Sequence, residues 1–217
     1  MRNLFLDLKI KKELKEFKVF KQNYKFIPLE VTETDDGSVF VANTCIREGK
    51  DGDWVGETED FVNVGYKIHG AISKVLSNLF PYEFYFRGFK LNSIEPIFQA
   101  FKFKDAKMQK LLFKYYGLNS NNIKSASNYD WKKTGIVYFL GKKFNRFEKE
   151  YAEFIDEVYI SAIQNSLYRN VIKSIGNKYI LHAMGGPKAE NTSWTRLEFE
   201  KELNCLKDFL IMKDNKK

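Results

Sequence analysis

The strongest constraint on the fold is a stripe of apolar residues that recurs at helical period in the second half of the chain. Spacings of three and four residues place successive side chains on one face of an α-helix. The pattern therefore predicts a long helix over Arg146–Leu167, with this face buried in a core. The stripe comprises Phe147, Tyr151, Phe154, Ile155, Val158, Tyr159, Ala162 and Ile163.

A second helix is predicted to begin after Ser93. Serine is a common N-cap, and Pro96 fits a first helical turn because its nitrogen needs no hydrogen bond there. We expect this helix to run to about Tyr116 and to stop at Gly117. A last helix is predicted over about 195–212. Its best core candidates are Leu203, Leu206 and Leu210.

The first 62 residues differ from the rest of the chain. A lysine-rich start over Leu4–Phe17 is a candidate helix. Two strand-like runs follow, Tyr24–Thr34 and Ser38–Cys45. The Asp35-Asp36-Gly37 segment between them is typical of a hairpin turn. We therefore predict a small N-terminal extension that contains β-structure.

Together these elements predict an α+β protein that is predominantly helical. The expected organisation is an N-terminal extension at 1–62, one main domain at 63–212 and a frayed tail at 213–217. A short extended segment, Tyr179–Gly186, enters a glycine turn and is the expected strand of the main domain. A length of 217 residues favours a single substantial domain over two small ones.

Several classes of protein are excluded by what the sequence lacks. The longest apolar run, Ile136–Leu140, is far shorter than the roughly 20 residues of a membrane span. No secretory signal pattern opens the chain, so we expect a cytoplasmic protein. Two cysteines, Cys45 and Cys205, and two histidines, His69 and His182, make no disulfide framework or metal site. We expect no metal and no cofactor.

The segment 102–146 is strongly basic and rich in aromatic residues. Its eleven basic and two acidic side chains give a charge of +9, within a chain of net charge +8. Basic groups neutralise phosphates and aromatic rings stack on bases, so the segment suits single-stranded DNA or RNA. The alternative is a solvated lysine face over buried aromatic rings. The basic residues are Lys102, Lys104, Lys107, Lys110, Lys114, Lys124, Lys132, Lys133, Lys142, Lys143 and Arg146; the acids are Asp105 and Asp130; the aromatics include Phe103, Phe113, Tyr115, Tyr116, Tyr129 and Trp131.

A row of polar residues on the second predicted helix is the main candidate for chemistry. Glu95, Gln99 and Lys102 lie at i, i+4 and i+7 and so share one face. Glu95 is a candidate general acid or base, and a desolvated Lys102 is a candidate nucleophile toward the aldehyde of an opened ribose. Gln99 is a candidate donor to sugar hydroxyls. An ordinary surface row of Glu, Gln and Lys is the alternative.

This part of the sequence resembles the NADAR family, which includes the YbiA-like N-glycosidases. The family shows a Ser-Asn-hydrophobe turn, a glycine, a glutamate that opens a helix, then Phe-Gln-Ala and a lysine. The matching elements here are Ser77-Asn78-Leu79, Gly88, Glu95, Phe98-Gln99-Ala100 and Lys102. Each element alone is weak, but their ordered combination is moderately specific. The resemblance extends over about Val64 to Leu210.

The resemblance implies an activity on N-glycosidic bonds to ribose. Family members remove ADP-ribose from guanine bases in nucleic acid, or cleave N-glycosidic intermediates of riboflavin metabolism. It implies catalytic roles for Glu95 and Lys102, and an aromatic wall at Tyr151 or Phe147. Further substrate contacts follow from the resemblance at Ser77, Asn78, Gln99, Trp194 and Arg196.

The sequence departs from the family pattern at two places. Pro96-Ile97 stands where the family has a histidine and an aromatic residue, and the loop before Trp194 is short and lacks an acid. These departures keep two alternatives open: an N-glycosidase acting on a small nucleotide or riboflavin-pathway intermediate, or a catalytically weak module that binds ADP-ribose or nucleic acid. A third class is an interaction protein that uses the N-terminal extension as its contact surface.

Overall fold

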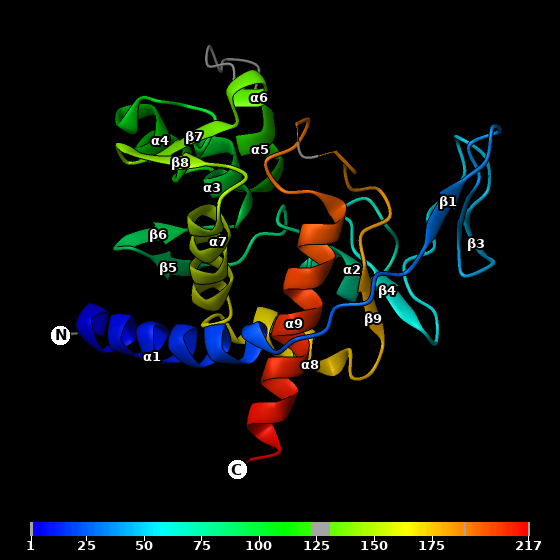
Figure 1. The fold of residues 1–217 in the computed structure, drawn as a ribbon, viewed down its shortest axis with the longest axis horizontal. Coiled ribbons are helices and arrows are strands. Elements are labelled where there is room, and N and C mark those ends of the chain that lie inside the picture. Colours follow the sequence, from blue (N-terminus) through cyan, green and yellow to red (C-terminus); the bar gives the residue numbers. More distant parts are fainter. Residues whose placement is uncertain (1, 123–130, 189, 217) are drawn as a thin grey trace. The chain divides into compact units, whose positions relative to one another are not determined.

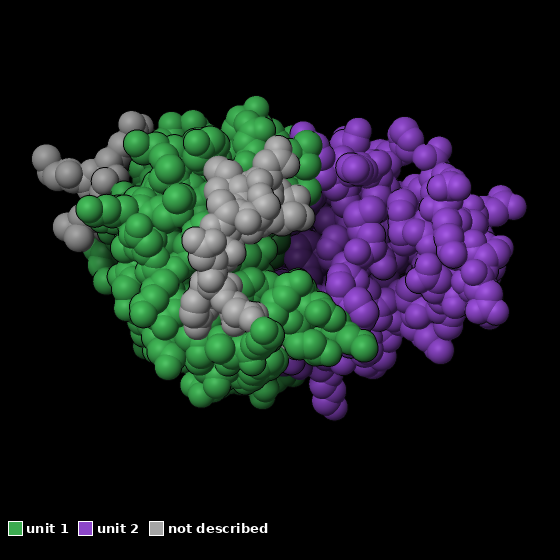
Figure 2. Space-filling model, turned by 90° about the horizontal axis from the view of Figure 1, so that it is seen from above, with its two compact units in different colours: residues 1–23, 78–170, 188–193 green, residues 24–77, 171–187, 194–217 purple. Residues whose placement is uncertain are grey.

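The computed structural model of the chain describes residues 2–122, 131–188 and 190–216. Helix accounts for 43 % of the chain and strand for 15 %, which confirms a predominantly helical α+β fold. The chain forms two compact units, which Figure 2 colours separately and which are described here one at a time. The predicted boundary after residue 62 stays a prediction. Unit 1 comprises 1–23, 78–170 and 188–193; unit 2 comprises 24–77, 171–187 and 194–217.

The N-terminal helix of unit 1 packs against a second long helix. Helix α1 spans Arg2–Gln22 and α7 spans Lys149–Ala162, and the two are in contact and run in different directions (Figure 1). Phe17 of α1 is fully buried. Lys18 Nζ is 2.7 Å from a carboxylate oxygen of Glu153 on α7. The helix that was predicted at the start of the chain is therefore confirmed.

The helix predicted over 146–167 is shorter than expected. α7 ends at Ala162, and a new helix, α8, spans Ser166–Ser174. The break has a local cause, because the Asn165 side chain accepts a hydrogen bond from the Tyr168 backbone N–H and so caps α8. Of the predicted apolar stripe, Phe147 alone lies before α7 and is 63 % exposed. The remaining members are buried: Tyr151, Phe154, Ile155, Val158, Tyr159, Ala162 and Ile163.

The prediction of one continuous helix from Ser93 to about Tyr116 is wrong. The chain instead forms three short helices: α3 (Glu95–Ala100), α4 (Ala106–Leu112) and α5 (Gly117–Asn122). Ser93 is not the N-cap of α3; its hydroxyl accepts a hydrogen bond from the Gly117 backbone N–H at 2.9 Å. The overlooked signal is Asp105, whose side chain accepts from Lys107 N and starts α4.

A buried glutamine stabilises the break between α3 and α4. Gln109 is fully buried, and its Nε2 donates to the carbonyl oxygens of Ala100, Phe103 and Tyr138 at 2.6–3.0 Å. Its Oε1 accepts from the Leu140 backbone N–H at 2.6 Å. The carbonyl oxygens of Ala100 and Phe103, at the break in the predicted helix, are thus paired by a side chain that also contacts the β7–β8 hairpin.

Two hairpins of unit 1 were not predicted. Strands β5 (Phe84–Phe86) and β6 (Phe89–Leu91) pair antiparallel, as do β7 (Ile136–Phe139) and β8 (Lys142–Asn145). The turns Arg87-Gly88 and Leu140-Gly141 have φ values of 48° and 82°, and of 48° and 86°. Two residues with positive φ form the turn that matches strand twist. The signal was a glycine between two runs of alternating apolar residues. The short helix α6 (Trp131–Thr134) precedes β7.

Unit 2 contains the β-structure that was predicted near the N-terminus. Strands β1 (Val31–Glu33), β2 (Val39–Val41) and β3 (Thr44–Arg47) form an antiparallel sheet. The turn at Asp35-Asp36-Gly37 joins β1 and β2, as predicted. The second predicted strand divides into β2 and β3, because Ala42 and Asn43 have positive φ and turn the chain.

The rest of unit 2 joins distant parts of the sequence. β4 (Phe61–Asn63) pairs in parallel with β9 (Tyr179–Leu181), which confirms the extended segment before the glycine turn. The last helix, α9 (Arg196–Asp214), packs against β9, and its predicted core residues Leu203, Leu206 and Leu210 are buried. Thr195 caps α9 in a capping box with Glu198. The short α2 spans Ala71–Val75.

Candidate functional site

The candidate site begins where α3 begins. Glu95 is the first residue of α3, and its backbone N–H donates to the carbonyl oxygen of Asn78 at 2.9 Å. The Asn78 side-chain oxygen accepts a hydrogen bond from the hydroxyl of Tyr159 on α7 at 3.0 Å. Asn78, a predicted substrate contact, therefore fixes the start of α3 relative to α7.

Lys102 reaches Glu95 through one intervening side chain. Lys102 lies beyond the end of α3, so the predicted i+7 position on one continuous helix is wrong. Its Nζ nevertheless donates to Gln99 Oε1 at 2.8 Å. Gln99 Nε2 in turn donates to Glu95 Oε1. The three side chains form a continuous ammonium–amide–carboxylate row, called here the α3 row.

The α3 row differs from an ordinary solvated row in its burial. Gln99 is 3 % exposed, while Glu95 and Lys102 are half-buried. Burying an amide costs free energy unless both its oxygen and its NH2 group are hydrogen-bonded. Here the oxygen accepts from the Lys102 ammonium, and the NH2 group donates to the Glu95 carboxylate. Gln99 hydrogen-bonds Glu95 and Lys102, and its predicted contact with sugar hydroxyls stays a prediction.

Trp131 is part of this site and was not predicted to be. Lys102 Nζ lies 5.7 Å from the centroid of the Trp131 ring, and Lys132 Nζ lies 6.0 Å from it. Trp131 is 7 % exposed. Its ring is close enough to attract the Lys102 ammonium, which also hydrogen-bonds Gln99. The sequence marked Trp131 as one aromatic of the basic segment, but no local spacing connects it with α3.

Tyr151, the predicted aromatic wall, lies in the core of unit 1. Its ring is 1 % exposed and packs edge-on against Phe101 with centroids 5.3 Å apart. Its hydroxyl donates to the carbonyl oxygen of Ser193 at 2.8 Å, and the Arg146 guanidinium lies 5.5 Å from the ring centroid. A contact between Tyr151 and a ligand stays a prediction.

Three predicted contacts belong to unit 2. Ser77 is buried just after α2, and its backbone N–H donates to Lys74 O. Trp194 is half-buried ahead of α9. Arg196 opens α9, and its backbone N–H donates to the carbonyl oxygen of Gly186 at 3.0 Å. The α3 row, with Asn78 and Tyr151, belongs to unit 1.

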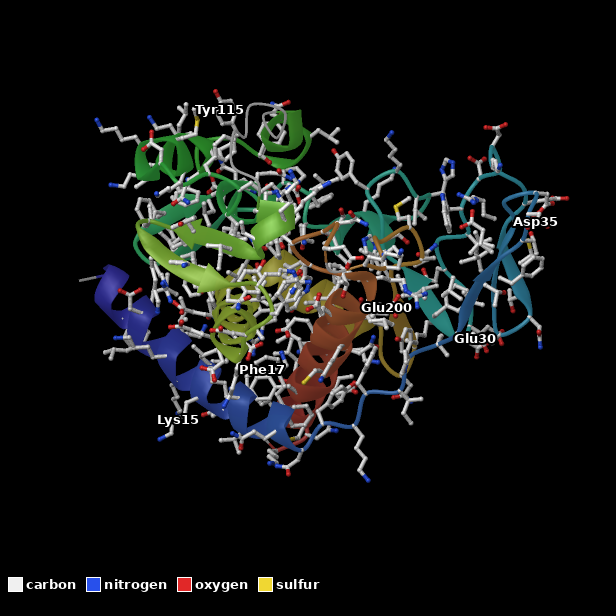
Figure 3. The ribbon with its side chains drawn as sticks, turned by 45° about the horizontal axis from the view of Figure 1, so that its top comes forward. Lys15, Phe17, Glu30, Asp35, Tyr115 and Glu200 are labelled. Atoms are coloured by element: carbon white, nitrogen blue, oxygen red, sulfur yellow. The ribbon has the colours of Figure 1, made fainter. Side chains whose placement is uncertain are left out.

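Unit 2 also contains a buried carboxylate that was not predicted. Glu200 on α9 is fully buried; it accepts hydrogen bonds from the Tyr179 hydroxyl and the His182 backbone N–H, both at 2.9 Å (Figure 3). Arg196 Nε lies 3.8 Å from the same carboxylate. Burial raises the pKa of the Glu200 carboxyl, and these three polar neighbours partly oppose the shift.

His182 is half-buried in unit 2. Its Nδ1 is 2.8 Å from the carbonyl oxygen of Val64, and its ring packs against Phe199 with centroids 4.7 Å apart. Burial lowers the pKa of His182, so the neutral ring is favoured. Gly185 approaches this ring so closely that a Cβ would lie 2.5 Å from His182 Cδ2.

The basic segment is largely an exposed lysine surface over buried rings. Phe101, Phe103, Phe113 and Trp131 are each at most 7 % exposed, so these rings pack in the core, whereas Tyr116 is 48 % exposed. Three residues of the prediction lie outside the described residues: Lys124, Tyr129 and Asp130. The exposed lysines are Lys104, Lys107, Lys110, Lys114, Lys132, Lys133, Lys142 and Lys143.

Two kinds of site are not found in the described part of the chain. Within 2–122, 131–188 and 190–216, no three His, Cys, Asp or Glu side chains are grouped so as to hold a metal ion. No helix of these ranges has the length and apolar character to span a bilayer.

The family model of bacteriophage protein GP30.3 matches residues 70–208. The chain belongs to this family. No curated protein and no solved structure matches the chain. The match includes the whole α3 row and Glu200, whereas α1 and the β1–β3 sheet lie outside it.

Proposed function

We propose that this member of the GP30.3 family is an N-glycosidase of the NADAR type, which releases ADP-ribose from guanine bases in nucleic acid. The observation that carries the proposal is the α3 row: a carboxylate and an ammonium held by one buried amide. The ordered NADAR-like motif from Ser77 to Lys102 supports it. The relationship of the GP30.3 family to NADAR and YbiA-like proteins supports it further.

The chemistry of the α3 row fits hydrolysis of a bond between ribose C1 and a base nitrogen. Water supplies a hydroxyl group to C1 and a proton to the departing base, and Glu95 transfers that proton. As an ammonium, Lys102 stabilises negative charge on the sugar oxygens. Alternatively, as a neutral amine it attacks C1 of the opened ribose, the base leaves with the proton from Glu95, and water then hydrolyses the Schiff base, which releases ADP-ribose and regenerates the amine. Gln99 keeps both groups in place while charge moves between them.

The substrate panel that tests the proposal separates it from the alternatives. Purified protein is incubated with ADP-ribosylated guanine in single-stranded DNA, in RNA and as a free nucleotide, and released ADP-ribose is quantified. The proposal predicts release from the strands. Release from the free nucleotide alone supports a small-molecule glycosidase, and tight binding without release supports a binding module; either result contradicts the proposal.

The role of Lys102 is tested with a matched lysine. Lys102→Met should lower the rate of release by about 100-fold, which is within the range for a group that acts on the transition state. Lys201→Met, at an exposed position on α9 outside the basic segment, should leave the rate unchanged. Equal rates for both variants would remove Lys102 from the mechanism.

The exposed lysines of the basic segment are the proposed contacts for flanking phosphates. Each phosphate neutralised adds roughly 0.7 to the log–log slope of affinity against salt for a single strand, so four contacts give about −3. Lys132→Ala with Lys133→Ala should make the slope shallower by about 1 or more. A flat salt dependence with equal rates on strand and nucleotide would contradict nucleic acid as the substrate.

A further inference from the structure

The outer face of α1 carries a pattern that the fold does not use. The inner face is fixed by buried contacts: Phe17 is fully buried, and Glu13 accepts hydrogen bonds from Arg169 at 3.0 Å and from Gln164 at 2.8 Å. Figure 3 shows Lys15 directed outward from α1, on the side away from Phe17. The outer face is therefore presented by a helix that is already ordered.

Five of the exposed residues of α1 follow a heptad repeat. Phe5, Leu8 and Val19 are 75 %, 57 % and 57 % exposed. With the exposed Lys12 and Lys15 they follow one another at steps of three, four, three and four residues. This spacing aligns side chains into the line along which two helices pair in a coiled coil. These five residues, called here the α1 seam, extend over about 21 Å of helix.

The charge around the α1 seam is strongly positive. Lys9 and Lys11 occupy the positions that flank a heptad seam, and both are exposed. Within the described residues, neither of them, nor Lys12 or Lys15, forms an ion pair with a carboxylate. Four ammonium groups therefore lie along this helix face, beside one carboxylate at a flanking position, that of the half-buried Glu16.

We propose that the α1 seam docks an acidic amphipathic helix of a partner protein. The partner places apolar side chains against Phe5, Leu8 and Val19, and Asp or Glu side chains against Lys12 and Lys15. Charge complementarity of this kind determines which helices pair. The proposal is independent of the proposed glycosidase activity.

The same pattern argues against other occupants. A second copy of this chain would bring lysines against lysines at the centre of the α1 seam. Membrane-bound helices place their lysines beside the apolar face, whereas Lys12 and Lys15 interrupt it here. A phosphate backbone would pair with the lysines but would leave Leu8 and Val19 without an apolar partner.

The test measures binding of a designed helix to the full chain. The probe is a fluorescent three-heptad peptide with Leu at a and d of its outer heptads, Glu at a and d of its central heptad, and Glu at e and g. Because one helix pair buries less than roughly 1,200 Å², we expect a dissociation constant in the micromolar range. A peptide with Lys in place of these Glu residues should not bind.

The decisive comparison uses charge reversal on the protein. Lys12→Glu with Lys15→Glu should weaken binding of the acidic peptide by about tenfold or more, and should create binding of the lysine peptide. The control, Lys107→Glu with Lys110→Glu on α4, makes the same change of charge away from α1 and should bind like the wild type. Leu8→Ala should weaken binding without changing the preference for the acidic peptide. Circular dichroism verifies that each variant is folded.

Four results would overturn the proposal. The first is no saturable binding of the acidic peptide up to about 1 mM, and the second is an equal loss of peptide binding in the α1 and α4 variants. The third is a wild-type dimer, detected by light scattering, that the α1 variant does not form. The fourth is binding of the wild type to phosphatidylserine vesicles or to a DNA strand that is specifically lost in the α1 variant.

Discussion

At the scale of single residues, Gln109 shows how one side chain replaces a stretch of helix. It is fully buried, and its four hydrogen bonds pair backbone groups from α3, the segment after α3, β7 and the β7–β8 turn. The position of α3, and with it the α3 row, depends on this residue.

Gln109→Met should therefore be strongly destabilising. The substitution keeps volume but leaves buried carbonyls and an N–H without partners, so we expect a loss of about 3–5 kcal/mol in the free energy of unfolding. Urea denaturation measures it. Lys107→Met, exposed on the same helix, should change stability by less than about 0.5 kcal/mol. A similar small change for both variants would show that these hydrogen bonds are not needed.

Glu200 predicts a distinctive dependence of stability on pH. Burial raises its pKa above 4.5, so the folded state binds the proton more tightly than the unfolded state. The stability that protonated Glu200 contributes is present below pH 4.5 and is lost as pH rises through the raised pKa. His182 has the opposite sign: its pKa is lowered below 6.5, so its contribution is present above that pH and is lost as pH falls.

Glu200→Gln should remove the first of these slopes. Relative to the wild type, the variant should gain stability as pH rises from about 4.5 toward 8, because it carries no buried carboxylate to ionise. Urea denaturation at several pH values provides the comparison, with the exposed Glu190→Gln as a control of the same chemistry. A wild-type-to-variant difference that does not change with pH would contradict the assignment.

At the scale of elements, local signals determined what could be predicted. The apolar stripe around Phe154, the hairpin at Asp36 and the capped helix after Thr195 could all be recognised, because each is encoded by neighbouring residues. The breaks at Asp105 and Asn165 were missed, since their capping side chains interrupt sequences that otherwise continue a helical pattern. The contact of Trp131 with Lys102 and the hydrogen bond of Glu200 with Tyr179 could not be predicted. Tertiary packing alone brings these residues together, so neighbouring residues in the sequence give no sign of either contact.

The β7–β8 turn offers a test with two substitutions of opposite sign. Leu140 has φ 48°, which is costly for a branched side chain, and Asn tolerates this conformation. Leu140→Asn should stabilise the protein by about 0.5–1 kcal/mol. Gly141→Ala should destabilise it by about 1 kcal/mol, because Gly141 has φ 86°, a conformation that strains alanine. No atom lies within 4 Å of an added Cβ, so a steric clash does not contribute. If Leu140→Asn and Gly141→Ala shift the midpoint of urea denaturation in the same direction, this account of the turn is contradicted.

At the scale of the whole molecule, unit 2 is assembled from segments at both ends of the sequence. Its apolar cluster combines Val39, Val41 and Ile46 of the β-sheet with Phe61 and Leu181. The sheet therefore shares an apolar cluster with Leu181 of β9. A chain that begins at residue 63 should lose cooperative unfolding in urea, because β9 loses both its strand partner and this cluster. Retention of a wild-type transition would show that the first 62 residues fold separately.

The central claim is that Glu95 performs glycosidic chemistry in the α3 row. The most direct measurement is the single-turnover rate of ADP-ribose release from ADP-ribosylated guanine in a single strand, for the wild type, Glu95→Gln and the exposed control Glu59→Gln. We predict that Glu95→Gln lowers the rate by about 100-fold to 10,000-fold, keeps the dissociation constant for the strand within about threefold, and leaves Glu59→Gln at the wild-type rate. A wild-type rate of release by Glu95→Gln would contradict the account.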